Sequence, residues 1–246
     1  MNDCLGDRMK TYENVSRQYL TRRMPTIIRL DGCHFHTFTK GFDKPYDEIL
    51  CATMQNTMKY LCENIQGCVL GYTQSDEITL VLCDYKKITT AAWYDKNMQK
   101  MCSVSASLAT LAFNKYFSSL NVVNQSYQYQ KANTKGATFD SRVFNLPKEE
   151  VCNCLIWRQK DATRNSIQAL GQSYFSQKEL EGKSCDDIQD MLFTKYQINW
   201  STDVPVKFKR GSCCVKTESG WVIDNDIPIF TSDRDYVEQR IVFNDG

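Results

Sequence analysis

The side chains best suited to chemistry lie in two short acidic segments, Asp31-Gly32 and Asp76-Glu77. The first follows the apolar run 26–30, and the second lies between the apolar runs 68–72 and 78–82. If these runs are neighbouring strands, the carboxylates meet at one edge of a sheet. Carboxylate oxygens suit Mg²⁺, and two such ions can activate an attacking hydroxyl and neutralise a leaving pyrophosphate. The pattern therefore indicates a metal-dependent enzyme that acts on nucleotides.

A simpler interpretation treats these residues as turns. Asp31-Gly32 alone is more often a turn than a metal site, because Asp and Gly tolerate the backbone angles that turns require. Asp76-Glu77 differs, since it places two like charges side by side at a tip flanked by apolar strands. A cation is the simplest means of holding such charges together. The second segment therefore favours the metal site.

Composition limits the class of protein. The 246 residues suffice for one elaborated domain or two small ones, and no apolar run is long enough to cross a membrane. The twelve cysteines form no C-x-x-C pair, and only two histidines are available to complete a zinc site. The N-terminus lacks the features of a signal peptide. We therefore expect a cytoplasmic protein with reduced, mostly buried thiols and no membrane segment.

Charge gives only a local argument for nucleic acid. The net charge of +1 does not favour a nucleic-acid partner for the whole chain. The segment 207–210, Lys-Phe-Lys-Arg, interleaves an aromatic side chain with three cations, as an RNA-binding groove would. A solvated strand face would carry the same pattern. Both interpretations remain open at this point.

The remaining pattern predicts the elements that position the acidic segments. Apolar spacing favours helices over residues 7–20, from Pro45 to Gly67 and over 97–117, where Met101, Val104, Leu108, Leu111 and Ala112 should face inward. Residues 119–137 are polar and are expected to form a long loop, and residues 139–144 a short strand. After Pro147, the pattern predicts a long helix to about Phe175, a helix over 184–196, and a hairpin from Val206 onward.

The order strand, helix, hairpin, helix, strand defines the expected fold class. It is the α+β arrangement of a polymerase palm, in which helices pack on one face of an antiparallel sheet. We expect residues 1–145 to form this palm-like catalytic core. Residues 146–246 should form a helical and hairpin extension that completes one compact unit.

Five motifs in order resemble the tRNA-histidine guanylyltransferase family, whose members extend RNA in the 3′-to-5′ direction. They are Arg29-Leu30-Asp31-Gly32 with Phe35-His36-x-Phe38, Lys44-Pro45-x-Asp47, Gln74-Ser75-Asp76-Glu77, Phe139-Asp140-x-Arg142, and Trp157-Arg158-Gln159-x-Asp161. The resemblance extends from about residue 5 to about residue 216. It implies a palm-like core, two Mg²⁺ ions and a tRNA substrate. In the family, ATP or sometimes GTP activates the 5′ end, and the 3′-hydroxyl of an incoming nucleotide then attacks it.

The resemblance also implies roles for individual residues. Asp31 and Asp76 would bind both metals with the Gly32 carbonyl as a further ligand, and Glu77 would support them in catalysis. The implied nucleotide-binding residues are Gly32, Cys33, His34, Phe35, His36, Lys44, Asp47, Ser75, Lys100 and Arg142. The candidate tRNA contacts are Arg158, Asn165, Lys209 and Arg210.

The residues themselves support these roles unevenly. Lys and Arg suit a polyphosphate, and a bidentate Arg can orient it. His36 could equally be an ordinary loop histidine. The assignment of Lys100 rests almost wholly on the resemblance, because an exposed helix lysine needs no other explanation.

Two departures from the family pattern bear on function. Cys33 stands where the family commonly has Arg, which leaves the first loop one cation short. Thr163 replaces the first residue of a His-Ile-Asn-Asn-Leu-Tyr stretch associated with recognition of histidine tRNA, and only Asn165 remains in place.

The chain therefore resembles bacterial and archaeal relatives that repair 5′-truncated tRNAs. We expect such a repair enzyme, a homotetramer by family resemblance. The alternatives are a guanylyltransferase that adds the extra guanylate to histidine tRNA and a non-catalytic tRNA-binding protein.

Overall fold

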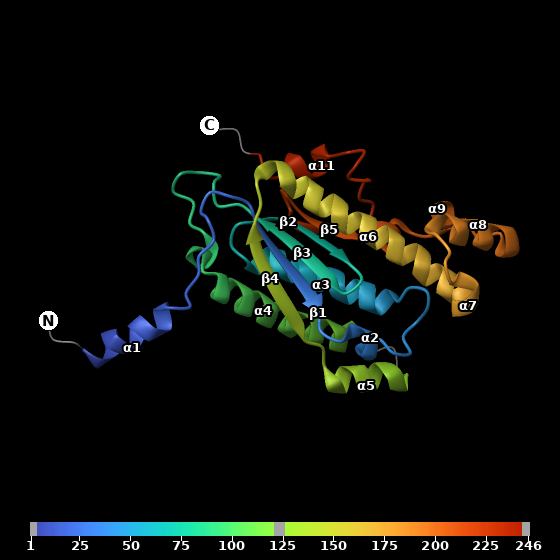
Figure 1. Cartoon of the computed structure of the whole chain (residues 1–246), viewed down its shortest axis with the longest axis horizontal. Helices are drawn as coiled ribbons and strands as arrows, with labels where there is room; N and C mark the ends of the chain where they lie inside the picture. The colour runs from blue at the N-terminus through green and yellow to red at the C-terminus, as the bar shows by residue number, and fades with distance from the viewer. Residues whose placement is uncertain (1–3, 121–125, 243–246) are drawn as a thin grey trace.

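The computed structural model describes residues 4–120 and 126–242. Its centre is a six-stranded antiparallel sheet in the order β4-β1-β3-β2-β5-β6 (Figure 1). The strands are β1 (Thr26–Gly32), β2 (Cys68–Gln74), β3 (Glu77–Leu82), β4 (Phe139–Asn145), β5 (Ser212–Thr217) and β6 (Gly220–Asp224). The predicted α+β class and antiparallel sheet are thus confirmed, and the C-terminal hairpin joins the sheet through pairing of β5 with β2.

Helices cover both faces of the sheet. One face packs against α3 (Glu48–Asn64) and α4 (Met98–Leu120), as predicted for the core. The long helix α6 (Lys148–Tyr174) crosses the other face (Figure 1) and packs there with the C-terminal segment that contains α11 (Asp235–Glu238). Every residue of β3 is buried, because β3 is an interior strand with both faces covered.

The strand pattern fixes which side chains point to which face. Ile28 and Leu30 pack with α3 and α4, whereas Ile27 packs with α6. Because side chains alternate along a strand, Arg29 and Asp31 lie on the α6 face with Ile27. The catalytic candidates on β1 therefore face α6.

The remaining helices surround this core. They are α1 (Leu5–Asn14), α2 (Phe35–Phe38), the 3₁₀ helix η1 (Trp93–Lys96), α5 (Tyr127–Lys135), α7 (Gln177–Leu180), α8 (Cys185–Tyr196), α9 (Trp200–Asp203) and α10 (Val206–Arg210). Helix α1 extends away from the body (Figure 1) and contributes no buried residue. Among the described residues, no helix has the length and apolar character needed to cross a bilayer.

Local sequence explains how α3 and α2 are held. Asp47 caps α3 by accepting a hydrogen bond from Leu50 N at 2.7 Å. Gly71 of β2 allows α3 to approach, since a Cβ there would lie 2.6 Å from Cys62 Sγ. Helix α2 is anchored by Phe35 and Phe38, whose rings pack into an aromatic cluster with those of α4.

The structure corrects four sequence predictions. The helix expected over residues 7–20 spans only Leu5–Asn14. Within the expected loop 119–137, residues 127–135 form α5, and residues 121–125 lie outside the described part of the chain. The segment 206–210 is the helix α10, so the hairpin begins only at Ser212. Leu111 was expected to face inward from α4 but is 60% exposed. The proposed boundary at residue 145 stays a prediction.

Candidate active site

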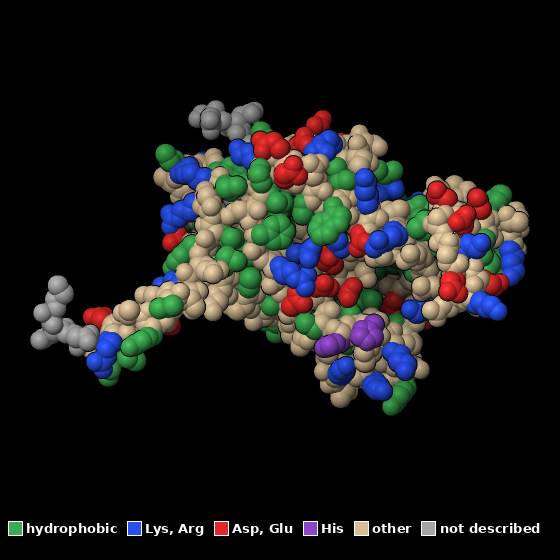
Figure 2. All heavy atoms as spheres, viewed as in Figure 1, with side chains coloured by type: hydrophobic (Ala, Val, Ile, Leu, Met, Phe, Trp, Pro, Cys, Tyr) green, Lys and Arg blue, Asp and Glu red, His purple; other side chains and the backbone are tan. Residues whose placement is uncertain are grey.

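The predicted carboxylates meet at one end of the sheet. Asp31, near the end of β1, is paired in register with Glu77 at the start of β3 and with Asp140 of β4. The turn between β2 and β3 is tied to β1, because Gly32 N donates a hydrogen bond to the Asp76 carbonyl at 3.1 Å. Figure 2 shows acidic and basic side chains gathered close to the two histidines of the chain. The register and this hydrogen bond bring Asp31, Asp76 and Glu77 to one end of the sheet, as the sequence predicts, and their roles in catalysis stay a prediction.

Asp76 occupies a strained turn. Ser75 before it adopts a left-handed φ of 51°, and Ser75 Oγ donates a hydrogen bond to Asp76 Oδ1 at 3.1 Å. Burial raises the pKa of the Asp76 carboxyl, and the negative charge of Asp31 raises it further. A bound cation would relieve both penalties.

Glu77 is held by a buried cation. Arg158 of α6 donates from Nε to Glu77 Oε1 at 2.7 Å and from Nη2 to Asp161 Oδ2 at 3.0 Å. Burial raises the pKa of Glu77, and Arg158 opposes part of that rise. The predicted tRNA contact at Arg158 is therefore not supported, because its side chain is 8% exposed and turned toward Glu77.

Arg142 adds a positive charge beside the carboxylates. Its guanidinium nitrogens lie 3.8 Å from Asp31 Oδ2 and 3.6 Å from Asp140 Oδ1, with half of the side chain exposed. This placement suits a phosphate that reaches the carboxylates through a metal ion. Asp140 was not assigned to the site from the sequence, although its pairing with Asp31 follows once β4 is aligned against β1.

The donor set fits Mg²⁺ bound jointly with substrate. Among residues 4–120 and 126–242, no three His, Cys, Asp or Glu side chains form a complete metal site. Mg²⁺ is commonly held by one or two carboxylates, with water and substrate phosphates completing its six ligands. Asp31 and Asp76 can supply that part, and their charges on a partly buried edge favour a cation.

The loop after β1 places its candidates unequally. Gly32 packs on the Phe35 ring, where a Cβ would lie 2.2 Å from the nearest ring carbon. Phe35 itself is buried in the aromatic cluster, so its side chain packs the core and does not face a nucleotide. Cys33 N donates to the Thr138 carbonyl at 2.8 Å, and His34 and His36 are exposed.

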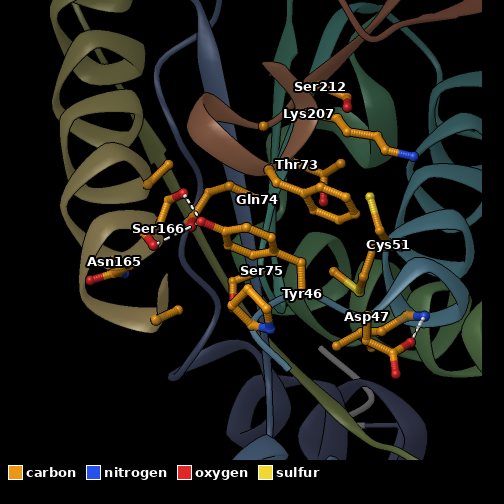
Figure 3. Close-up of a pocket in the computed structure, with 17 residues that line it drawn as sticks. Tyr46, Asp47, Cys51, Thr73, Gln74, Ser75, Asn165, Ser166, Lys207 and Ser212 are labelled. Carbon is orange, nitrogen blue, oxygen red and sulfur yellow. Dashed lines mark hydrogen bonds between the residues drawn. The ribbon is translucent and has the colours of Figure 1, made fainter. Parts of the chain in front are cut away.

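A pocket of about 180 Å³ adjoins the Asp76 turn (Figure 3). Ser75 lies in its wall, and Tyr46 stacks on Phe208 with ring centroids 4.8 Å apart. The Tyr46 hydroxyl donates to the Ser166 carbonyl at 2.9 Å, which fixes the ring. Two further predicted residues, Asp47 and Asn165, line the pocket. The pocket has one aromatic wall and polar groups at its rim, as a small-molecule site would.

Three predicted cations are not brought to the carboxylates. Lys209 is 8% exposed and donates to the Ser201 carbonyl at 2.6 Å, and Arg210 donates to the Ile227 carbonyl at 3.1 Å. The inward orientation of Lys209 corrects the prediction that it contacts tRNA, whereas Arg210 is half-buried and its predicted contact with tRNA stays a prediction. Lys100 lies in the first turn of α4. The part of α4 nearest the carboxylates is marked by Thr110, whose hydroxyl accepts a hydrogen bond from Phe139 N, and Phe139 is paired with Gly32. Ten helical residues separate Lys100 from Thr110, roughly 15 Å along the helix axis. Lys44 is exposed beside Pro45 of the pocket wall.

A palm-like sheet that presents paired carboxylates beside a guanidinium is the arrangement of a metal-dependent nucleotidyltransferase. The family model of tRNAHis guanylyltransferase matches residues 6–147, and the chain belongs to this family of enzymes, which add nucleotides to the 5′ end of tRNA.

Solved structures agree over nearly the whole chain. A bacterial tRNA(His) guanylyltransferase-like protein in complex with ATP is 46% identical, with a TM-score of 0.89, covering 98% of this chain and 100% of that one. A second structure of a bacterial tRNA(His) guanylyltransferase-like protein, in complex with GTP, is 40% identical with a TM-score of 0.80 over the same shares. An uncharacterized protein of Acanthamoeba polyphaga mimivirus is 29% identical over 264 residues, which span 99% of this chain and 89% of the relative.

Proposed function

We propose that this protein repairs 5′-truncated tRNAs by template-directed 3′-to-5′ addition, with Mg²⁺ as cofactor and ATP or GTP as activator. The observation that carries the proposal is the closeness of Asp31 to the partly buried Asp76, with Arg142 beside Asp31 at the sheet end. Similar structures are described in complex with ATP and with GTP, which supports the choice of activator. By family resemblance the working form is a cytoplasmic homotetramer.

Each residue at the sheet end has a separate role in the proposed reaction. Asp31 and Asp76, with the Gly32 carbonyl, would hold two Mg²⁺ ions, which when bound activate the attacking hydroxyl and neutralise the leaving pyrophosphate. Arg142 binds phosphate oxygens beside them, and the Glu77–Arg158 pair keeps the end of β3 in place. His36, Lys44 and Ser75 contribute further contacts to the triphosphate.

The pocket beside Ser75 would receive the base of the activating nucleotide. Its stacked Tyr46–Phe208 pair offers an apolar wall, and Asn165 lies at the same pocket. Asp47 shapes this wall through the cap of α3 and does not bind the ligand directly, because its carboxylate already accepts hydrogen bonds from Leu50 N, Asp43 N and the Tyr129 hydroxyl.

Activation can be tested with two forms of one RNA. A tRNA that carries a 5′-monophosphate needs ATP or GTP, because its phosphate has no good leaving group. A 5′-triphosphorylated tRNA already carries pyrophosphate and should be extended without activator. The test measures nucleotide addition to both RNAs with and without ATP. If omission of ATP slows both equally, the two-step mechanism is wrong for this protein.

Substrate choice separates repair from addition of guanylate to histidine tRNA. Addition of guanylate to histidine tRNA is favoured by the family's name and by Asn165. Repair is favoured by Thr163 on α6, because threonine lacks the flat imidazole that can stack on an unpaired base. We expect several tRNAs with truncated acceptor stems to be extended, each by the nucleotide that pairs with its 3′ strand. The measurement compares kcat/KM for truncated histidine tRNA and for truncated tRNAs with unrelated anticodons. A preference of a hundredfold for histidine tRNA, roughly 2.7 kcal/mol, would favour the rival.

A further inference from the structure

Trp157 of α6 is an exposed indole beside the carboxylates that no step above uses. Its side chain is 53% exposed, although its neighbours Leu155 and Arg158 are buried. The guanidinium of Arg29 lies 5.4 Å from the ring centroid, and that of Arg158 lies 4.5 Å from it. An aromatic ring held by two cations and open to solvent is well placed to contact a flat, negatively charged partner.

The position of Trp157 relates it to the reaction. Arg29 precedes Asp31 by two residues on the α6 face of β1, a separation of about 7 Å along the strand. Arg29 Nε is buried and has no hydrogen-bond acceptor among the residues that the structure describes. A phosphate or base oxygen at this point would satisfy that donor. The indole and Arg29 thus form one surface next to the metal-binding carboxylates.

The carboxylates lie between this surface and the pocket that adjoins the Asp76 turn. The pocket is lined by residues 73–75 at the end of β2, whereas Arg29 lies on β1, and β3 separates these strands in the sheet. A small pocket suits a free mononucleotide. An open aromatic face suits a base that belongs to a polymer, because the chain can continue into solvent.

We propose that Trp157, flanked by Arg29 and Arg158, is the platform on which the 5′-terminal base of the RNA stacks during extension. This inference rests on the proposed function, because it assigns a binding surface for its RNA substrate. Trp157 is a positioning residue here: it sets the place of the terminal nucleotide so that the 5′-phosphate meets Asp31 and Arg142. Arg29 Nε donates to an oxygen of the same nucleotide.

The test uses an acceptor-stem RNA hairpin that lacks its first 5′ nucleotide and carries 2-aminopurine at the new 5′ end. Stacking quenches the fluorescence of 2-aminopurine, and anisotropy of a distant label gives the Kd. The variants are Trp157→Phe, which keeps an aromatic face, and Trp157→Leu, which keeps apolar volume without it. The matched control is Phe193→Leu on α8, since Phe193 is also 53% exposed.

We expect the wild type, Trp157→Phe and Phe193→Leu to quench the probe. Trp157→Leu should lose the quenching and bind roughly 5- to 150-fold more weakly, the range that corresponds to about 1–3 kcal/mol for one base stacked on an aromatic side chain. ATP should raise the Tm of Trp157→Leu as it does that of the wild type, because the pocket is separate. Loss of that ATP effect would show a general disturbance through Arg158 and would overturn the platform role.

Normal quenching by Trp157→Leu, or an equal loss in Phe193→Leu, would also overturn the inference. The proposed function fails in a different way. If the wild type quenches the probe through Trp157 but adds no nucleotide with ATP, Mg²⁺ and all four NTPs, the platform stands and the repair activity is wrong.

Discussion

Asp31 and Asp76 are the two side chains most directly tied to the proposed chemistry of the site. Each lies where a strand ends, and backbone pairing holds the two close enough for their charges to interact. Arg142 lies 3.8 Å from Asp31 Oδ2, but Asp76 forms no ion pair with any residue that the structure describes, and an unpaired carboxylate at a partly buried edge is unfavourable for the fold alone. Retention of this pair is therefore better explained by a bound cation than by the turn interpretation.

Replacement of either carboxylate tests this directly. We expect Asp31→Ala and Asp76→Ala to lower the rate of nucleotide addition by a factor of roughly 10²–10³ or more, because stabilisation of the developing charge is lost. Neither side chain anchors the core, so circular dichroism and Tm should remain those of a folded protein. Near-wild-type turnover by a folded Asp76→Ala protein would refute the metal assignment.

Asp76 also predicts how stability depends on pH and Mg²⁺. Because burial and Asp31 raise its pKa in the folded state, the folded protein binds this proton more tightly than the unfolded chain. The proton on Asp76 therefore stabilises the folded protein. This stabilisation is fully present below the ordinary pKa of 3.8 and is lost as the pH rises through the higher pKa of the folded state. In metal-free protein at neutral pH, we therefore expect Asp76→Asn to unfold at a higher temperature than the wild type, with the difference disappearing below about pH 4.

Mg²⁺ should reverse the order of the two unfolding temperatures, so that the wild type unfolds at a higher temperature than Asp76→Asn. At a concentration of one hundred times its Kd, the ion would stabilise the wild type by about 2.7 kcal/mol, or roughly 5–10 °C in Tm for a chain of this size. Asp76→Asn should gain far less. Thermal unfolding with Mg²⁺ or EDTA measures both effects without reference to activity, and an equal gain in both proteins would show that Asp76 is not a ligand.

Helix α6 connects the second face of the sheet to the site. Arg158 connects α6 to Glu77 of β3. Both side chains are removed from water, so each charge needs the other as its partner. We expect Arg158→Leu to lower the free energy of unfolding by about 3–5 kcal/mol, because Glu77 is left charged and buried. The matched control is Arg164→Leu on the same helix, whose exposed side chain pairs with Asp161 and should contribute at most about 1 kcal/mol. Urea unfolding compares the two variants, and similar losses would contradict the structural role of the Glu77 pair.

The same elements show what the sequence can and cannot predict. The strands β1 to β4 are predictable, because apolar runs bounded by turn residues are typical of strands in a covered sheet. Helix α5 is not, since its sequence Tyr-Gln-Tyr-Gln-Lys-Ala-Asn-Thr-Lys is polar and only Tyr129 and Ala132 are buried. Lys209 and Arg210 have the composition of an RNA contact, but tertiary packing buries Lys209 and ties Arg210 Nε to the Ile227 carbonyl. Residue type and spacing thus predict chemistry at strand ends better than they predict the orientation of long side chains on short helices.

Helix α1 stands apart from the packed core of the molecule (Figure 1). It has ten residues and none of them is buried, although isolated helices of this length are marginal in water. Leu5 and Tyr12 of α1, and Val15 directly after its last residue, are 64%, 70% and 83% exposed, and the helix stands away from the body in Figure 1. A second copy of the chain would cover these side chains in the homotetramer expected from the family.

We therefore expect the combined substitution Leu5→Ser, Tyr12→Ser and Val15→Ser to dissociate the assembly. Burial of one large apolar side chain is worth about 1.5–3 kcal/mol, so loss of three should weaken each contact by at least roughly 10³-fold. Light scattering coupled to size-exclusion chromatography measures the mass over a range of concentrations. Val222→Ser is the control, because Val222 is 43% exposed on β6 at the opposite edge of the molecule's sheet from β4. If the triple variant keeps the wild-type mass at low concentration, α1 does not mediate assembly. If Val222→Ser loses as much mass as the triple variant, the contact involves more than one surface.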